Sequence, residues 1–159
     1  MATNLNFEDW LALNQLYADY ASAVDSGHWD LWPEFFTDDC VYRLQPRENH
    51  ERGFPLATLS FSSKGMLKDR VYGIKETLFH DPYYQRHVVG APVVREAGDG
   101  HFRCEANYAV FRTKLSDAST VFNVGRYLDT VVQTPAGMKF ASRECIYDSE
   151  MIPNSIIYP

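Results

Sequence analysis

The sequence lacks the residue patterns by which a metal or redox centre is usually recognised. Its five histidines form no His-x-His or His-Glu-x-x-His pair, and its three cysteines form no Cys-x-x-Cys pair. Such pairs hold the metal ions and clusters of many redox and hydrolytic centres. We therefore do not expect the chain to bind a metal or a cofactor of its own.

Positive charge is also scarce. Lysine and arginine number 15 against 21 aspartates and glutamates, which gives a formal net charge of -6. Nucleic acid is bound through an excess of basic residues, so it is not an expected partner. No stretch approaches the ~18 consecutive apolar residues needed to cross a bilayer, and residues 1–9 are not a basic segment followed by an apolar one. We expect a soluble, cytoplasmic protein with no membrane partner.

Cysteine is too rare and too scattered for a disulfide framework. Cys40, Cys104 and Cys145 are an odd number, and each lies within a strand-like run. Free cysteine behaves as a small buried apolar residue. All three are therefore predicted to lie in the core rather than to act as nucleophiles.

What the chain does contain is enough apolar surface for one substantial core. With 159 residues, of which 45% are apolar, it has the size of a single domain spanning residues 1–159. Its first half carries helical patterns and its second half carries strand patterns.

The most regular helical pattern begins after the N-cap candidate Asn6 and ends at Gly27, which supplies a left-handed stop. Its apolar stripe, spaced by three and four residues, consists of Leu13, Leu16, Tyr17, Tyr20, Ala21 and Val24. A short, broken helix is predicted over residues 29–36, where Pro33 interrupts a run of core aromatic rings. A third helix, capped by Ser63, is predicted from the stripe Leu67, Val71, Ile74 and Leu78.

The region between the second and third helices is less regular. A strand is predicted over residues 40–45. The segment Pro46–Ser63 mixes charged residues with an apolar patch, and its sequence does not decide its conformation. It has the character of a loop shaped by a partner.

From Arg86 onward the apolar period changes to two, which is typical of half-buried strands. The clearest alternation places on one face Phe102, Cys104, Ala106, Tyr108 and Val110. Short polar turns separate long runs, so four antiparallel strands are predicted between Arg86 and Asp148, in a sheet long enough to twist and curl. Pro92 indicates an edge or a bulge in the first run, and Gly125 a bend in the third.

Helices packed in the concavity of a strongly curved antiparallel sheet form an α+β roll. This pattern is similar to the fold shared by nuclear transport factor 2, scytalone dehydratase and ketosteroid isomerase, the NTF2-like or cystatin-like roll. The cone of such a roll can hold a small ligand or can be filled by its own side chains. The fold alone therefore leaves the function open.

Four segments resemble the small, or β, subunits of Rieske-type aromatic-ring-hydroxylating oxygenases. They are Tyr17–Asp25, Trp32–Tyr42, Met66–Val71 and Tyr84–Gly90. The sharper signatures are the Leu-x-Asp-Arg of the third helix and the Arg86-His87 pair. Within that family, Pro46–His50 and Ser63–Arg70, together with the absence of a long amino-terminal arm, are similar to the small subunit of a salicylate 5-hydroxylase. Terephthalate and anthranilate systems are close alternatives.

The resemblance implies a non-catalytic subunit that supports assembly of a catalytic large (α) subunit. The large subunit would carry a Rieske [2Fe-2S] cluster and a mononuclear non-haem iron, and a reductase and a ferredoxin would deliver electrons from NADH. Three copies of each subunit would form an α3β3 hexamer in which this chain self-associates as a trimer. The exposed sheet face and the segment Pro46–Ser63 would make the contacts, and this chain would hold no catalytic, cofactor-binding or metal-binding residue.

A stand-alone dehydratase or isomerase of the same fold is the alternative. His87 on an inward strand face, with Asp39, Tyr42 and Tyr84 nearby, would then act as a general acid or base. The simpler interpretation makes His87 a hydrogen-bonded structural residue and pairs Arg86 with an acidic neighbour.

A third possibility is a plain homo-oligomeric binding module. Four charged residues lie on the late strands: Arg126, Asp129, Arg143 and Glu144. They could form ion pairs between subunits, but solvated surface positions are the commoner outcome for such charges. The apolar tail Met151–Pro159 is predicted to dock, either on its own sheet or on another subunit.

Overall fold

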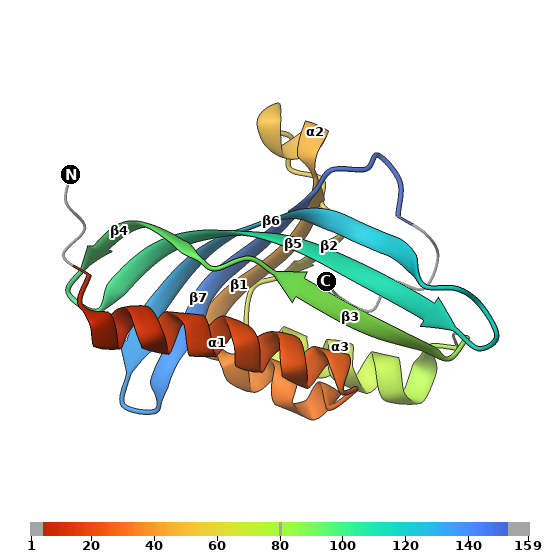
Figure 1. Cartoon of the computed structure of the whole chain (residues 1–159), viewed down its shortest axis with the longest axis horizontal. Coiled ribbons are helices and arrows are strands. Elements are labelled where there is room, and N and C mark those ends of the chain that lie inside the picture. Colours follow the sequence, from red (N-terminus) through yellow and green to blue (C-terminus); the bar gives the residue numbers. More distant parts are fainter. Residues whose placement is uncertain (1–4, 80, 153–159) are drawn as a thin grey trace.

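The computed structural model describes residues 5–79 and 81–152. Within them, a single seven-stranded sheet has α1 and α3 along one side, while the short helix α2 projects from it elsewhere (Figure 1). The predicted tail from Met151 to Pro159 falls largely outside the described residues, although Ile152 packs against the core. No helix in this described part is both long and apolar enough to cross a bilayer.

Helix α1 spans Phe7–Asp25 and follows the predicted capping chemistry. The Asn6 side chain accepts a hydrogen bond from the backbone N–H of Asp9 at 2.8 Å, and Gly27 adopts a φ of +69° just after the helix. The buried stripe consists of Leu13, Leu16, Tyr17, Tyr20, Ala23 and Val24. The predicted stripe is confirmed except that Ala23 is buried in place of Ala21.

The broken second helix is a 3-10 helix, η1, over Trp29–Phe35, with Pro33 inside it. Trp32 and Phe36 are fully buried, as predicted for core rings. Strand β1 follows at once over Phe36–Pro46, so it begins earlier than the predicted residue 40. The pairing of β1 is irregular between Phe36 and Val41, and this bulge lets the strand start before regular pairing resumes.

One pairing differs from the predicted antiparallel sheet, because β1 lies parallel to β7 (Gly137–Tyr147). Parallel neighbours need a long connection, and here most of the chain supplies it. The short turns of the second half exclude a parallel crossover only within that half. The segment Pro46–Ser63 folds into the five-residue helix α2, Arg47–Glu51, and into β2, Leu59–Phe61, which pairs antiparallel with β1.

Helix α3 spans Lys64–Tyr72, and the Ser63 side chain caps it by accepting a hydrogen bond from the N–H of Met66 at 3.2 Å. One turn of π-helix, η2, continues it over Gly73–Thr77. The predicted stripe is buried at Leu67, Val71 and Ile74, whereas Leu78 is 46% exposed. The wider π turn rotates the following residues off the buried face, so the predicted position of Leu78 was wrong.

The remaining strands are β3 (Tyr83–Val89), β4 (Val93–Gly98), β5 (His101–Lys114) and β6 (Thr120–Thr134). The sheet order is β2-β1-β7-β6-β5-β3, and β4 also pairs with β5. The first predicted run therefore breaks near Pro92 into two strands on one edge of β5, which confirms the edge position. All five predicted inward residues of β5 are buried.

Gly125 marks a close approach of two strands. A Cβ atom at this position would lie 2.0 Å from the carbonyl oxygen of Ile146 on β7. Only glycine allows the backbones of β6 and β7 to meet here.

The three cysteines are free and buried, as predicted. Burial raises the pKa of the Cys40 thiol to about 11 and the pKa values of Cys104 and Cys145 to about 12. All three thiols are therefore neutral at physiological pH and serve as core residues.

Candidate functional site

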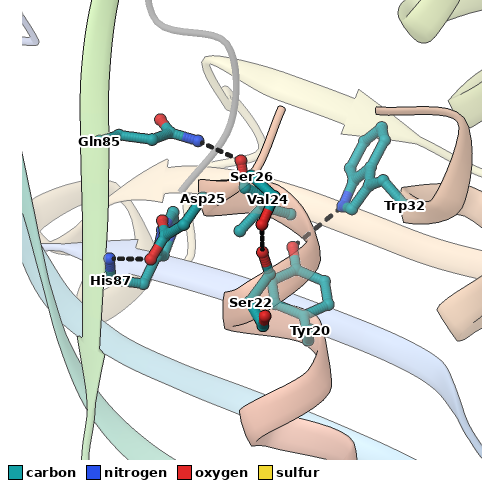
Figure 2. Close-up of polar contacts among 8 residues, drawn as sticks. All are labelled: Tyr20, Ser22, Val24, Asp25, Ser26, Trp32, Gln85 and His87. Carbon is teal, nitrogen blue, oxygen red and sulfur yellow. Dashed lines mark hydrogen bonds and ion pairs between the residues drawn. The ribbon is translucent and has the colours of Figure 1, made fainter. Parts of the chain in front are cut away.

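The space between the helices and the curved sheet is filled by large side chains. The largest fully buried ones are Trp32, Arg143, Tyr20, Tyr42, Tyr127, Phe36 and Phe140. Trp32 packs edge-on against Tyr42 with ring centroids 5.1 Å apart, and its indole N–H donates to the hydroxyl of Tyr20 at 3.0 Å (Figure 2). Interlocking rings of this kind are typical of a packed core.

A charged pair lies at the centre of this interior. Arg143 on β7 stands directly opposite Asp129 on β6, and both side chains are completely buried. Nε of Arg143 donates to Oδ1 of Asp129 at 3.0 Å, and Nη2 donates to Oδ2 at 2.8 Å. The hydroxyl of Tyr17 on α1 also donates to Oδ2. The carboxylate thereby links two strands and a helix through charge-assisted bonds.

Aromatic rings surround the guanidinium group. Cζ of Arg143 lies 3.9 Å from the ring centroids of both Tyr127 and Phe140 and 4.3 Å from that of Tyr20. Burial, and then the charge of Asp129, raises the pKa of Tyr17 well above its usual value, so its hydroxyl remains a donor. The interior is thus occupied by a neutralised ion pair.

The predicted surface or intersubunit position of Asp129 and Arg143 was wrong. Their strands alternate, and buried Tyr127 and Val131 flank Asp129 two residues away on either side, while buried Cys145 follows Arg143 by two. The period-two pattern therefore carried a signal for an inward ion pair. The neighbouring charges behave as predicted, because Arg126 is exposed and Glu144 is partly exposed.

A second polar pair joins the end of α1 to β3. Nδ1 of His87 lies 2.6 Å from Oδ1 of Asp25, and the backbone N–H of His87 donates to Oδ2 at 2.8 Å (Figure 2). Next to them, the Gln85 amide donates to the carbonyl of Val24 at 3.0 Å. The side chains of His87 and Asp25 are 0% and 5% exposed. Nε2 of His87 is buried and has no hydrogen-bond partner in the described chain.

The structure does not bring together the four residues of the enzymatic alternative. Tyr84 is 79% exposed and, three residues before His87 on the same strand, points to the opposite face. Asp39 is exposed and Tyr42 is buried, and both belong to β1, which β7, β6 and β5 separate from β3 in the sheet. The partner of His87 is Asp25, which sequence reasoning missed. The only local signal was a carboxylate at the end of an apolar helix.

Exposed apolar side chains gather on the outer face of the sheet. The "sheet patch" consists of the exposed residues Tyr84, Arg86, Val88, Val121 and Val124 and the partly buried Phe111. Its residues are neighbours by register, since Arg86 stands opposite Phe111 and Phe111 opposite Val121. Arg86 is exposed and makes no ion pair within residues 5–79 and 81–152, so the predicted acidic neighbour is not found there.

The segment Pro46–Ser63 adds a second exposed surface. Helix α2 projects from the body of the sheet (Figure 1), and beyond it Phe54 and Leu56 are 48% and 72% exposed. Cζ of Arg52 lies 5.9 Å from the Phe54 ring centroid. A projecting mixed surface of this kind suits contact with another chain.

Comparison with known proteins gives consistent matches along almost the whole chain. The sequence profile of the SnoaL-like domain matches residues 6–144. The small subunit of anthranilate 1,2-dioxygenase from Burkholderia cepacia is 30% identical over 154 residues, covering 97% of this chain and 96% of the relative. Subunit beta 1 of the terminal oxygenase component of terephthalate 1,2-dioxygenase from Comamonas sp is 28% identical over 142 residues, covering 89% of this chain and 92% of the relative.

A solved structure agrees with these relatives. The β subunit ascribed to an aromatic-ring-hydroxylating dioxygenase of Novosphingobium aromaticivorans superposes with a TM-score of 0.84 at 32% identity, covering 91% of this chain and 92% of that one. The predicted NTF2-like roll is confirmed, and its sheet is mixed rather than wholly antiparallel.

Proposed function

Because the chain belongs to the SnoaL-like family and, within it, to the small subunits of aromatic-ring-hydroxylating dioxygenases, we propose that it is a non-catalytic subunit that supports a catalytic large subunit. The domain, residues 1–159, would act as a scaffold. Its exposed sheet face and the segment Pro46–Ser63 would supply the contacts with other subunits.

One observation carries the proposal, namely that the interior of the roll is filled. The Arg143–Asp129 pair and the rings around it occupy the place where the cone would otherwise hold a ligand. A substrate could occupy that place only by separating a fully buried ion pair, which costs several kcal/mol for each charge left alone. This cost favours a supporting role over a catalytic one.

The metal chemistry of the complex is assigned to the large subunit. That subunit would carry a Rieske [2Fe-2S] cluster and a mononuclear non-haem iron, supplied with electrons from NADH through a reductase and a ferredoxin. The donor set of this chain fits neither group, since its described residues contain no cluster of three or more His, Cys, Asp or Glu side chains able to hold a metal. In this proposal the redox step belongs to the large subunit, and this chain supports it without holding a metal.

The substrate is proposed to be a benzene ring that carries a carboxylate, with salicylate 5-hydroxylation as the specific reaction. Anthranilate and terephthalate, which appear in the names of the relatives above, carry a carboxylate on the ring as salicylate does. The segments Pro46–His50 and Ser63–Arg70 support the narrower assignment. An α3β3 assembly, with this chain as a trimer, completes the proposal.

Co-expression of this chain with its neighbouring reading frame tests the proposal. We expect a brown, iron-containing complex that retains the chain and that hydroxylates salicylate faster than anthranilate or terephthalate when NADH, reductase and ferredoxin are added. Turnover of another ring acid would refute the salicylate assignment alone. A colourless chain that purifies alone and turns over substrate by itself would refute the supporting role.

The Asp25–His87 pair favours a second candidate, an acid–base dehydratase or isomerase. Asp25 orients the imidazole and leaves Nε2 without a partner in the described chain, and a hollow of about 410 Å³ borders Asp25 and Gln85. The imidazole is fully buried, however, which favours a role in pinning α1 to β3. Turnover of hydroxyaromatic or enone substrates by the isolated chain, abolished in His87→Ala, would establish the second candidate.

A further inference from the structure

The molecule has a third exposed surface with apolar side chains, besides the sheet patch and the segment Pro46–Ser63. The "helix patch" is the outer side of the first two turns of α1 and consists of Phe7, Glu8, Trp10 and Leu11. Its three apolar side chains are between 41% and 72% exposed, and the rings of Phe7 and Trp10 stack with centroids 5.9 Å apart. Clustered apolar side chains left in water mark a surface that another protein covers.

The two patches carry opposite charges. In the sheet patch, Arg86 stands opposite Phe111 and lies between Tyr84 and Val88 along β3. In the helix patch, Glu8 is exposed and forms no ion pair within the described residues. Among the residues that the structure describes, each patch is therefore an apolar surface with one charge that no ion pair compensates, and the two charges are of opposite sign.

The patches lie far apart and face in different directions. The first turns of α1 lie at one end of the sheet's long axis, and the start of β3 lies at the other (Figure 1). Helix α1 lies along one face of the sheet (Figure 1), and the helix patch is on the exposed side of that helix. The sheet patch is on the opposite face of the sheet, because its residues on β3 alternate with Gln85 and His87, which face α1. They cannot meet within one molecule. A contact between them joins different surfaces of two copies, and such a head-to-tail contact builds a closed ring when the rotation between copies closes and an open filament when it does not.

We propose that the helix patch of one copy docks on the sheet patch of the next, with Glu8 facing Arg86, and that repetition of this head-to-tail contact closes the ring of three copies. This inference rests on the trimer of the proposed function and names the surfaces that form it. The segment Pro46–Ser63 then remains open to the large subunit.

The test is sedimentation equilibrium of the purified full chain and of four charge variants. Arg86→Glu and Glu8→Arg are each expected to weaken self-association at least tenfold, or about one decade in the dissociation constant, because each brings like charges together. The double variant Glu8→Arg/Arg86→Glu restores the opposite pair and is expected to return to within about threefold of the wild type. The control, Arg103→Glu, makes the same charge change on the same sheet face at the far end of β5; it also breaks the exposed ion pair with Glu96 there, and it is expected to leave association unchanged.

Three results would overturn the inference. One is a wild-type chain that is monomeric at every concentration, and another is a double variant no better than the single ones. The third is an Arg86→Glu chain that self-associates normally but no longer co-purifies with the large subunit, which would assign the sheet patch to that partner. Co-purification itself decides the proposed function separately, so a failed ring and a failed scaffold give different results.

Discussion

The buried ion pair gives the most demanding test of how this roll is held together. Replacing Arg143 with Met keeps most of the side-chain volume between the rings of Tyr127 and Phe140 but removes the charge. Asp129 is then left buried with only the Tyr17 hydroxyl as a side-chain donor. The reverse change, Asp129→Leu, leaves a buried guanidinium among aromatic rings. Replacing both residues removes the two charges together.

The expected magnitudes follow from burial. Both side chains are 0% exposed, and removing one partner of such a pair costs about 3–5 kcal/mol. Whole domains are stable by only about 5–15 kcal/mol, so each single variant should lose a large part of its stability. For a chain of this length the loss corresponds to a fall in Tm of about 6–20 °C. The double variant should lose less than either single one, because no uncompensated charge remains.

Urea unfolding followed by circular dichroism, with calorimetry for Tm, measures these differences. The control is Arg126→Met, the same substitution at an exposed position of the neighbouring strand, which should change stability by less than about 0.5 kcal/mol. Our account of the interior would be refuted if Arg143→Met cost no more than Arg126→Met. It would also fail if the loss in the double variant equalled the sum of the two single losses.

Three further outcomes are expected. Gly125→Ala should lower the unfolding free energy by at least about 3 kcal/mol or prevent folding, because the added Cβ would lie 2.0 Å from the carbonyl oxygen of Ile146 on β7. The control Gly98→Ala, whose added Cβ meets nothing within 4 Å, should be nearly neutral in the same urea assay. Burial raises the pKa of Cys145 to about 12, so no cysteine should react rapidly with Ellman's reagent at neutral pH in the folded chain, and fast labelling would contradict its burial. The hydrogen bond and charge of Lys64 lower the pKa of Glu34, so this pair should stabilise the folded chain above the ordinary glutamate pKa and lose that effect as the pH falls through the lowered pKa. The variant Glu34→Gln should therefore narrow the difference in unfolding free energy between neutral and acidic pH. An unchanged difference would contradict the pairing.

Elements specified by neighbouring residues were predicted well. The Asn6 cap, the apolar stripe and Gly27 bound α1, and the alternation from Phe102 to Val110 gave the buried face of β5. Each depends on contacts within a turn of helix or along one strand. The π turn after α3 was missed because a single extra residue in a turn leaves little trace in an apolar pattern.

The candidate site was predicted less well, and the reason is physical. The choice of Asp25 rather than Asp39 as the partner of His87 depends on where α1 ends relative to β3, 62 residues later in the chain. The spacing of residues within one strand does not show which residue from a distant part of the chain will lie beside them. The alternation along each strand carried a signal for the exposure of Tyr84 and the burial of Arg143, but the pairing of Arg143 with Asp129 followed from the register of β6 and β7.

By itself the sequence determined the helices, the long strands, the turns between them and the kinship with small oxygenase subunits, because these depend on residues close together in the chain or on their order. Only the tertiary structure decided that β1 joins β7 in parallel, that Asp129 and Arg143 meet inside the roll, and that His87 is held by Asp25. Those contacts join residues far apart in the sequence. They form only when the sheet has closed over the helices, so that burial, rather than local preference, selects the partners.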